Sequence, residues 1–539
     1  MAHRYTLEFY LETLAVRLQM PLTTAIVYGM GAMASASGGN DGKVIVFYGQ
    51  TLGVRQDQVT LALGLSSLLG VLIDPVIAVI SDHLKTPLGR RHPLMYGAMI
   101  PAVWYQYQLW HPPREEEPSA LFSHLLGSMI LLKLFLSGFE VPSGALINEL
   151  APETHDRTVM MSLRYLFGWI CWATLTSISF FVLLRPSDKT DNGFFNEDGY
   201  RAYGTLAASV SAVSMLVSAI GTHPHVPDLA LPAKAMPAPR GIIDEVRNIL
   251  QIHNARTVLA SSMLSSWCGG VSSGLFQYFL IYLFKFSTNQ AGVIVLLSGP
   301  AVIGSMRLST YAGRAWGKKT GVLRLAWLDL FIKPLPLILA MVIGDGTALF
   351  VLTIPLMLVS NTLGAAQRTI GASLSMDLAD EANALSGSNS EALFYSVISV
   401  SDGTVHSLGM FAAGLFLRAV SFSQTAGTSE ETDVQVHHLA WLFISVSTPI
   451  GMVALRILSA YRPPPSDGDD DPRLSSLPAP SGEMGAEYGG MALRGRSQRG
   501  MDLHAAEGMS NPDEPDHQHH NPRRGQQGGY ANVSSSELL

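Results

Sequence analysis

The chain has 539 residues, of which 48% are hydrophobic and only 14% are charged, whereas a soluble domain carries about 25% charged residues. This composition excludes an ordinary soluble protein and, with it, a nucleic-acid-binding one. The formal net charge of −7 decides little, because in a membrane protein the distribution of charge over the loops matters more than its sum. Cys171 and Cys268, the two cysteines, lie in apolar runs and offer neither a disulfide framework nor a zinc cluster.

Apolar runs of about 20 residues, the length that crosses a bilayer, recur from one end of the chain to the other. The first run is interrupted by Asn40, Asp41 and Lys43. An acidic, proline-rich turn over residues 111–118 separates the third run from the fourth, because no helix continues through it. The runs predict an all-α polytopic membrane protein with about twelve transmembrane helices, over residues 21–50, 58–81, 94–110, 122–148, 159–184, 202–221, 257–284, 289–309, 323–343, 346–370, 391–417 and 438–458.

Basic residues are distributed unequally over the loops between these spans. One set of loops holds roughly fifteen Lys and Arg residues and the opposite set roughly seven, and the poorer set also contains the acidic run at residues 115–117. Because loops rich in Lys and Arg stay in the cytoplasm, the basic side is predicted to be cytoplasmic, with both termini there.

The order of spans and polar segments predicts two halves. Residues 1–20 are an N-terminal cytoplasmic segment, 21–221 a first six-helix bundle, 222–256 a polar, proline-rich cytoplasmic loop, and 257–458 a second six-helix bundle. Residues 459–539 are rich in Pro, Gly, Ser and Asp, so a disordered cytoplasmic tail is expected. Its His517, His519 and His520 could bind a metal, but a solvated polar tail is the simpler interpretation.

The two halves resemble each other. Gly89-Arg90-Arg91 follows the second span, and a similar basic segment, residues 313–319, follows the eighth. Two six-helix bundles of this kind, related by a pseudo-twofold axis, are the plan of the major facilitator superfamily.

Three segments are similar to one branch of that superfamily, the melibiose carrier-like glycoside–pentoside–hexuronide:cation symporters. The first is Asp74-Pro75 with the basic turn that ends at Pro93. The second, residues 139–169, is long and specific, and the third is the acidic entry to the eleventh helix at residues 375–396. The similarity covers about residues 20–460.

This resemblance implies alternating access, with a small solute bound at the midplane and driven by Na⁺ or H⁺. It implies that Glu140 and Arg164 bind substrate and that Asp74 handles the coupling cation. It also assigns the cytoplasmic gates to Asp82, Arg90, Arg91, Arg157, Arg314 and Lys318.

The chain departs from the family pattern at three positions. Gly70 replaces a second acid on helix two, Ala36 replaces the acid on helix one, and Gly403 replaces the lysine on helix eleven. Asp41 is a displaced candidate for the helix-one acid, and His406 is the titratable group nearest to Gly403.

These departures favour H⁺ over Na⁺ as the coupling ion, or facilitative transport without coupling, because a sodium site needs several oxygen ligands whereas a single buried acid suits a proton. No other cofactor and no metal site is expected.

Structural roles compete with these assignments. Asp74 could serve helix packing, and Glu140 with Arg164 could be a structural ion pair. Lys133 lies seven residues before Glu140 on the same helical face and could neutralise it. Asp329 and Lys333, at i and i+4, are predicted to pair with each other.

The sequence as a whole favours a secondary transporter for a sugar-like or other small organic solute. A lysolipid or amphipath transporter and a non-transporting receptor or scaffold on a degenerate fold are the alternatives. The protein is expected to be a monomer in contact with lipid. The plasma membrane is the preferred location, and an organelle membrane is the alternative. An enzyme is not expected, because the one segment that resembles a phosphate loop, residues 313–320, has the wrong glycine spacing and no preceding strand.

Overall fold

The computed structural model describes residues 21–38, 41–84, 86–113, 117–151, 154–187, 192–228, 247, 250–344, 346–386, 391–422 and 430–462. The predictions for the N-terminal segment, for most of the loop at 222–256, for the tail beyond residue 462 and for its three histidines lie outside the described residues.

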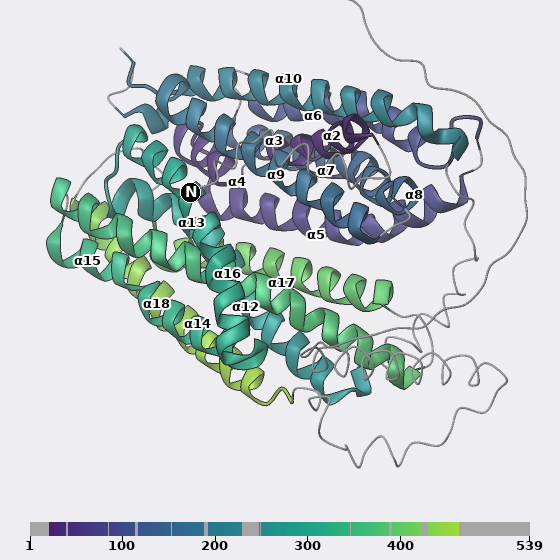
Figure 1. Ribbon diagram of the computed structural model, residues 1–539. Coiled ribbons are helices and arrows are strands. Elements are labelled where there is room, and N and C mark those ends of the chain that lie inside the picture. Colours follow the sequence, from purple (N-terminus) through teal and green to yellow (C-terminus); the bar gives the residue numbers. More distant parts are fainter. Residues whose placement is uncertain are drawn as a thin grey trace, which may run out of the picture. The chain divides into compact units, whose positions relative to one another are not determined.

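The first half of the chain contains the helices drawn from purple to blue in Figure 1. Its first span is interrupted, as the polar residues near Asp41 suggest, and ends in a π-helical segment. The elements are α2 (Leu22–Met30), α3 (Met33–Gly38), α4 (Asp41–Val44), η1 (Ile45–Thr51), α5 (Gln56–His83), α6 (His92–Trp110), α7 (Pro118–Ala145), α8 (Ile147–Leu150), α9 (Thr154–Ile178), η2 (Ser179–Leu183), η3 (Gly193–Phe195), α10 (Glu197–Thr222) and η4 (His223–Asp228).

The second half repeats this order of long helices, drawn from teal to yellow (Figure 1). Its third span is divided into two helices at Lys333 and Pro334. The elements are α12 (His253–Tyr278), η5 (Phe279–Leu283), α13 (Thr288–Trp316), α14 (Lys318–Ile332), α15 (Leu335–Ile343), α16 (Thr347–Ser386), α17 (Glu391–Ala419) and α18 (Glu430–Ser459).

The all-helical class is confirmed. In the described part of the chain, eight helices are long and apolar enough to cross a membrane. The other four predicted spans coincide with the interrupted segment α2–η1 and with α6, α12 and α17. The proline-rich turn at 111–118 separates α6 from α7 as predicted, since α6 ends at Trp110 and α7 begins at Pro118.

Local sequence signals set several helix ends. Ser287 and Gln290 form a capping box at the start of α13, in which each side chain bonds the backbone N–H of the other residue. Gly317, with a φ of 75°, reverses the chain between α13 and α14 in a conformation that other residues adopt at a cost. The basic segment predicted after the eighth span therefore comprises the last turn of α13, Gly317 and the first residues of α14.

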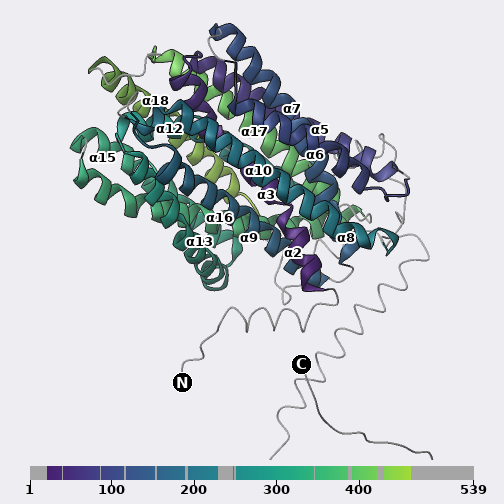
Figure 2. The same cartoon turned by 90° about the horizontal axis from the view of Figure 1, so that it is seen from above.

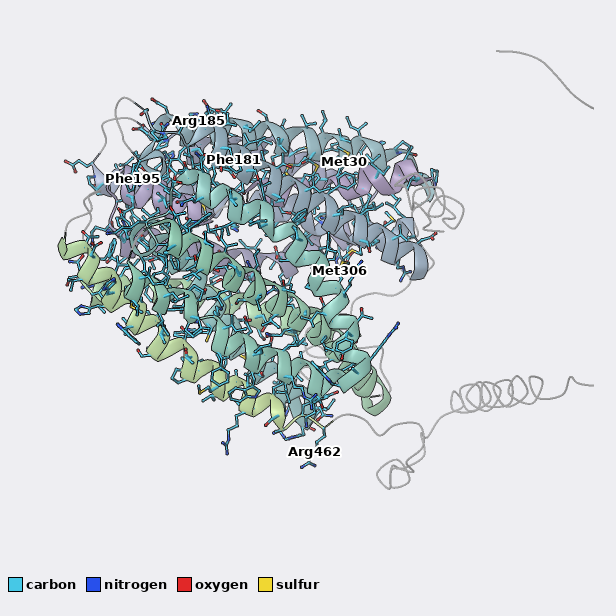
Figure 3. All side chains as sticks on the ribbon, turned by 60° about the vertical axis from the view of Figure 1, so that its left-hand side comes forward. Met30, Phe181, Arg185, Phe195, Met306 and Arg462 are labelled. Carbon is cyan, nitrogen blue, oxygen red and sulfur yellow. The ribbon has the colours of Figure 1, made fainter. Side chains whose placement is uncertain are left out.

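The two halves meet along a few helix pairs. The most extensive contact is between α5 and α17, which lie side by side in Figures 1 and 2. Contacts of α4 and η1 with α12 and of α9 and η2 with α13 add to the interface. In the last of these, Phe181, labelled in Figure 3, packs so close to Gly292 that an added Cβ there would lie 2.6 Å from the ring. Cavities between these pairs are therefore lined by both halves.

Candidate functional site

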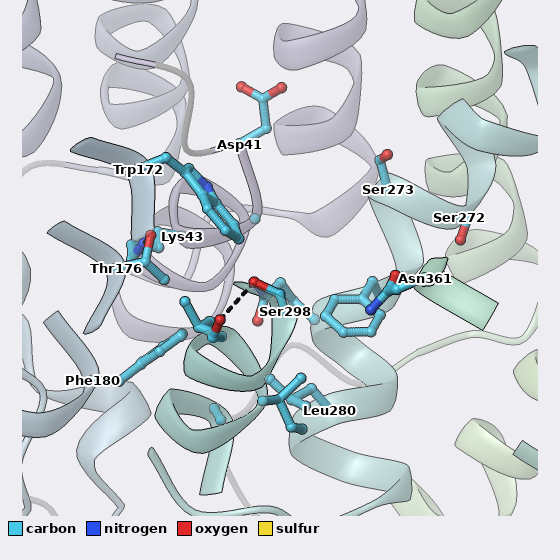
Figure 4. Close-up of a pocket in the computed structure, with 16 residues that line it drawn as sticks. Asp41, Lys43, Trp172, Thr176, Phe180, Ser272, Ser273, Leu280, Ser298 and Asn361 are labelled. Carbon is cyan, nitrogen blue, oxygen red and sulfur yellow. Dashed lines mark hydrogen bonds between the residues drawn. The ribbon is translucent and has the colours of Figure 1, made fainter. Parts of the chain in front are cut away.

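A central cavity of about 480 Å³ lies between the two halves (Figure 4). Trp172 and Thr176 of α9 and Asp41 of α4 line it from the first half. Serine, glutamine and asparagine side chains line it from the second half together with apolar ones such as Phe276 and Leu280, and Ser298 donates a hydrogen bond to the Val295 carbonyl oxygen at 2.6 Å. Hydroxyl, amide and carboxylate groups among aromatic and aliphatic side chains suit a small solute that has both hydroxyl groups and apolar faces. The polar side chains from the second half are Ser272, Ser273, Gln277, Ser298 and Asn361.

Lys43 also lines the central cavity, although only 5% of it is exposed. Its ammonium group donates to the Thr176 hydroxyl at 3.3 Å and lies 4.8 Å from the ring centre of Tyr203 and 5.4 Å from that of Phe180. Aromatic faces stabilise a cation electrostatically. This lysine therefore provides a fixed donor at the wall of the cavity.

A second cavity, the acid cavity, brings together most of the residues to which the sequence drew attention. Asp74 of α5, Lys133 and Glu140 of α7 and His406 of α17 line this space of about 410 Å³, together with Gly70 and Gly403. One oxygen of Asp74 is buried and has no hydrogen-bond partner among the described residues. Asp41 does not line this cavity and lies at the central one.

Glu140 and Arg164 form an ion pair with an N···O distance of 2.6 Å. Arg164 also donates to the Ser143 hydroxyl at 3.1 Å, and its guanidinium lies 5.3 Å from the ring centre of Tyr28. The second Glu140 oxygen is buried without a hydrogen-bond partner in the described part of the chain. The pair thus connects α7 to α9 and leaves one carboxylate oxygen unused.

At the basic end of the first half, Asp82, Arg90 and Arg91 form a cluster with Glu149 of α8. Glu149, whose side chain is 3% exposed, accepts from Arg90 at 2.6 Å and from Arg91 at 3.0 Å. Asp82 lies 2.7 Å from Arg91 and 3.9 Å from Arg90. The predicted gate residues therefore connect α5, the turn that follows it and α8.

The other predicted gate residues have different surroundings. Arg157 of α9 donates to the Ala151 carbonyl oxygen at 2.7 Å. Arg314 and Lys318 are exposed on either side of the Gly317 turn. Among the described residues, the ion pairs of the predicted gate residues stay within the first half.

At the opposite end, two tyrosine–glutamine pairs connect the halves. Tyr278 of α12 donates to Gln56 of α5, and Tyr282 of η5 donates to Gln50 of η1. All four side chains are buried. These pairs hold the two halves together at the end of the molecule that the loop charges predict to be non-cytoplasmic.

Sequence reasoning missed part of this geometry. It predicted an Asp329–Lys333 pair, but Asp329 instead accepts a hydrogen bond from Ser360 at 2.6 Å, and no ion pair joins the two among the described residues. Helical spacing cannot show which neighbouring helix offers a better partner. Asp402 was also missed, although an acid beside Gly403 in an apolar helix was a usable signal.

Two helical halves with apolar, membrane-length helices and cavities between them have the architecture of a membrane transporter. A family model described as "MFS/sugar transport protein" matches residues 15–462, and the chain belongs to this family. The expected membership of the major facilitator superfamily is thereby confirmed, and the protein is a multi-pass membrane transporter, not an enzyme.

Individual relatives are distant. An uncharacterized symporter of Synechocystis sp. (strain ATCC 27184 / PCC 6803 / Kazusa) is 24% identical over 207 residues, which is 36% of this chain and 36% of the relative. The match therefore spans about a third of that protein.

Two solved structures share the fold. A bacterial homologue of the human lysosomal transporter Spinster, in an inward-facing and unoccupied conformation, is 12% identical with a TM-score of 0.58, over 83% of this chain and 98% of that one. The nucleoside transporter NupG is 15% identical with a TM-score of 0.55, over 82% and 99%. At these identities the likeness concerns the fold alone.

Proposed function

We propose that this protein is a secondary active transporter that moves a small, sugar-like organic solute by alternating access. The central cavity carries this proposal, because both halves contribute polar side chains to it and Trp172 offers a flat apolar face among them. A pyranose has the same mixture of hydroxyl groups and apolar faces. The alternation itself would break the tyrosine–glutamine pairs at one end and bring the halves together at the other.

The proposed coupling ion is H⁺, and the acid cavity supports this choice. A sodium ion needs several oxygen ligands in a small cage, whereas Lys133 places a positive charge in the same cavity as Asp74 and Glu140. A proton needs only one acceptor, and the buried unpartnered oxygen of Asp74 provides it. His406, on the opposite wall, is the second proton site in this proposal.

The test is uptake into proteoliposomes with independently imposed pH and Na⁺ gradients, over a panel of sugars, other polar solutes and lysolipids. A pH gradient should drive accumulation of a polar solute, and Asp74→Asn should abolish the dependence on that gradient. Asp433→Asn is the control, since Asp433 forms a surface ion pair with Lys285 at 2.9 Å. Uptake that depends on neither the pH gradient nor the Na⁺ gradient would refute coupling. Uptake of lysolipids but of no polar solute would identify an amphipath transporter instead.

The orientation proposed with this function follows from the loop charges, and the monomeric state and the plasma membrane are separate parts of the proposal. The basic ends of α5 and α13 face the cytoplasm, both termini lie there, and the protein works as a monomer in the plasma membrane. Protease protection of terminal tags in sealed vesicles tests the orientation, and mass photometry in nanodiscs tests the monomer.

A further inference from the structure

The second half contains a cavity of its own, of about 630 Å³, which we call the C-terminal cavity. Lys333, Arg368, Asp329, Asp402 and His406 line it, from α14, α16 and α17 and from the break between α14 and α15. Charged side chains within membrane-spanning segments are costly and usually face a functional space. The roles of two acidic and two basic side chains in this cavity therefore need an explanation.

The two acids already have donors. Asp402 accepts from the Ser262 hydroxyl, which lies 2.8 and 2.7 Å from its two oxygens. Asp329 accepts from Ser360 at 2.6 Å. Hydroxyl groups of neighbouring helices thus satisfy both carboxylates, and neither depends on Lys333 or Arg368.

The two cations have no such partners. In the described part of the chain, no carboxylate forms an ion pair with Lys333 or Arg368, and both side chains are exposed. Lys333 lies directly before Pro334, at the kink between α14 and α15, so its side chain leaves the helix where the two segments change direction.

A smaller cavity of about 420 Å³ connects this region to the central cavity. It is lined by Lys333 and Arg368, which it shares with the C-terminal cavity, and by Ser273 and Asn361, which it shares with the central one. A solute in the central cavity can therefore extend a substituent toward both cations.

We propose that Lys333 and Arg368 bind an oxyanion, a carboxylate or a phosphate, carried by the transported solute. This assignment rests on the proposed transport function and narrows its substrate class to acidic solutes. Arginine forms paired hydrogen bonds with either oxyanion, and the lysine adds a point charge. The hydroxyl-rich part of the solute then lies beside Trp172.

The test measures binding to the purified full-length protein, without transport. Glycerol 3-phosphate, glycerate and glycerol share a three-carbon scaffold and differ in carrying a phosphate, a carboxylate or neither. The first two should raise the melting temperature and glycerol should not. Lys333→Met and Arg368→Gln should each weaken binding by about tenfold or more, as expected for the loss of a charged hydrogen bond. Lys319→Met and Arg307→Gln, at cations that do not line this cavity, are the matched controls and should bind as the wild type does.

The outcomes separate the site from the transport function. Equal shifts with all three probes, or equal weakening in the control variants, would overturn the oxyanion site. If Lys333→Met does not fold, Lys333→Gln replaces it, and Arg368→Gln tests the same site independently. Stabilisation by phosphatidylglycerol nanodiscs but not by the soluble probes would assign the oxyanion to a lipid and overturn the solute claim. Binding without uptake in liposomes would contradict the transport proposal and leave the site standing.

Discussion

At the scale of single residues, Gly70 and Lys133 decide how the acid cavity works. An added Cβ at Gly70 would lie 3.7 Å from the Lys133 Cβ and 3.9 Å from its Cδ, so the lysine stem packs where the resemblance leads one to expect a second acid. Glu140 is paired with Arg164 rather than with Lys133, contrary to the pairing suggested by their spacing on α7. Because Glu140 does not neutralise it, Lys133 places an additional positive charge in the acid cavity.

Removing this charge should change the ion preference. In Lys133→Met, Na⁺ should bind between Asp74 and Glu140 and raise the melting temperature, whereas choline should not. At a concentration of one hundred times the Kd, such binding adds about 2.7 kcal/mol to the free energy of unfolding. Melting of the purified protein in NaCl and in choline chloride measures this effect.

Lys285→Met, at the surface ion pair with Asp433, controls for general salt effects on this measurement. Asp74→Asn combined with Lys133→Met should lose the response to Na⁺. A wild-type protein that is itself stabilised by Na⁺, or a folded Lys133→Met that is not, would contradict the role of Lys133. Lys133→Gln provides the same comparison if the methionine variant is unstable.

Glu149 offers a second prediction at this scale. It accepts from both Arg90 and Arg91 while almost fully buried, and removing one partner of a buried ion pair costs about 3–5 kcal/mol. Glu149→Gln should therefore lower the melting temperature markedly. Asp57→Asn, at the exposed pair with Arg55, should have little effect, and equal effects of the two changes would argue against the cluster as a structural element.

At the scale of helices, hydropathy predicted the positions of the membrane spans, but it did not predict which residues far apart in the sequence contact each other. The second span was predicted over 58–81 and α5 covers Gln56–His83, because the length and apolarity of a span are properties of the local sequence. The division of the ninth span at Lys333 and Pro334 was not predicted, since a proline within a span is compatible with a kinked helix as well as with two helices. Asp74, Glu140 and His406 were singled out from the sequence, but their common cavity and the contact between Glu149 and Arg90 depend on tertiary packing.

The tyrosine–glutamine pairs belong to this scale, because each joins one element of the first half to one of the second. Tyr278→Phe with Tyr282→Phe removes two neutral hydrogen bonds, each worth about 0.5–1.5 kcal/mol, and should favour opening at that end. A Ser298→Cys reporter in the central cavity, on a background with Cys171 and Cys268 replaced by serine, should then react faster with a maleimide added from the non-cytoplasmic side.

The control for this experiment is Tyr311→Phe, at an exposed tyrosine of α13. It should leave the labelling rate of the reporter unchanged. If the double phenylalanine variant also labels at the wild-type rate, the two pairs do not limit access to the central cavity.

At the scale of the whole molecule, residues 1–463 and 464–539 form separate units. The cavities discussed above lie within the first unit. Deletion of residues 464–539 should therefore leave uptake and oxyanion binding at wild-type levels, measured in the same proteoliposomes and melting assays. Loss of uptake in a folded, correctly inserted truncation would instead support a receptor or scaffold in which the tail is essential.

The location of the Asp82–Arg90–Arg91–Glu149 cluster has a consequence for the energetics of switching. Its ion pairs lie within one half, so they should persist if the halves rock, and the contacts proposed to break at the opposite end are made by uncharged side chains. Dissolved salt weakens attraction between exposed charges but has little effect on buried neutral hydrogen bonds. The balance between the two conformations of the empty protein should thus be nearly independent of ionic strength, and the strongest electrostatic influence on it should come from the charge of the cargo.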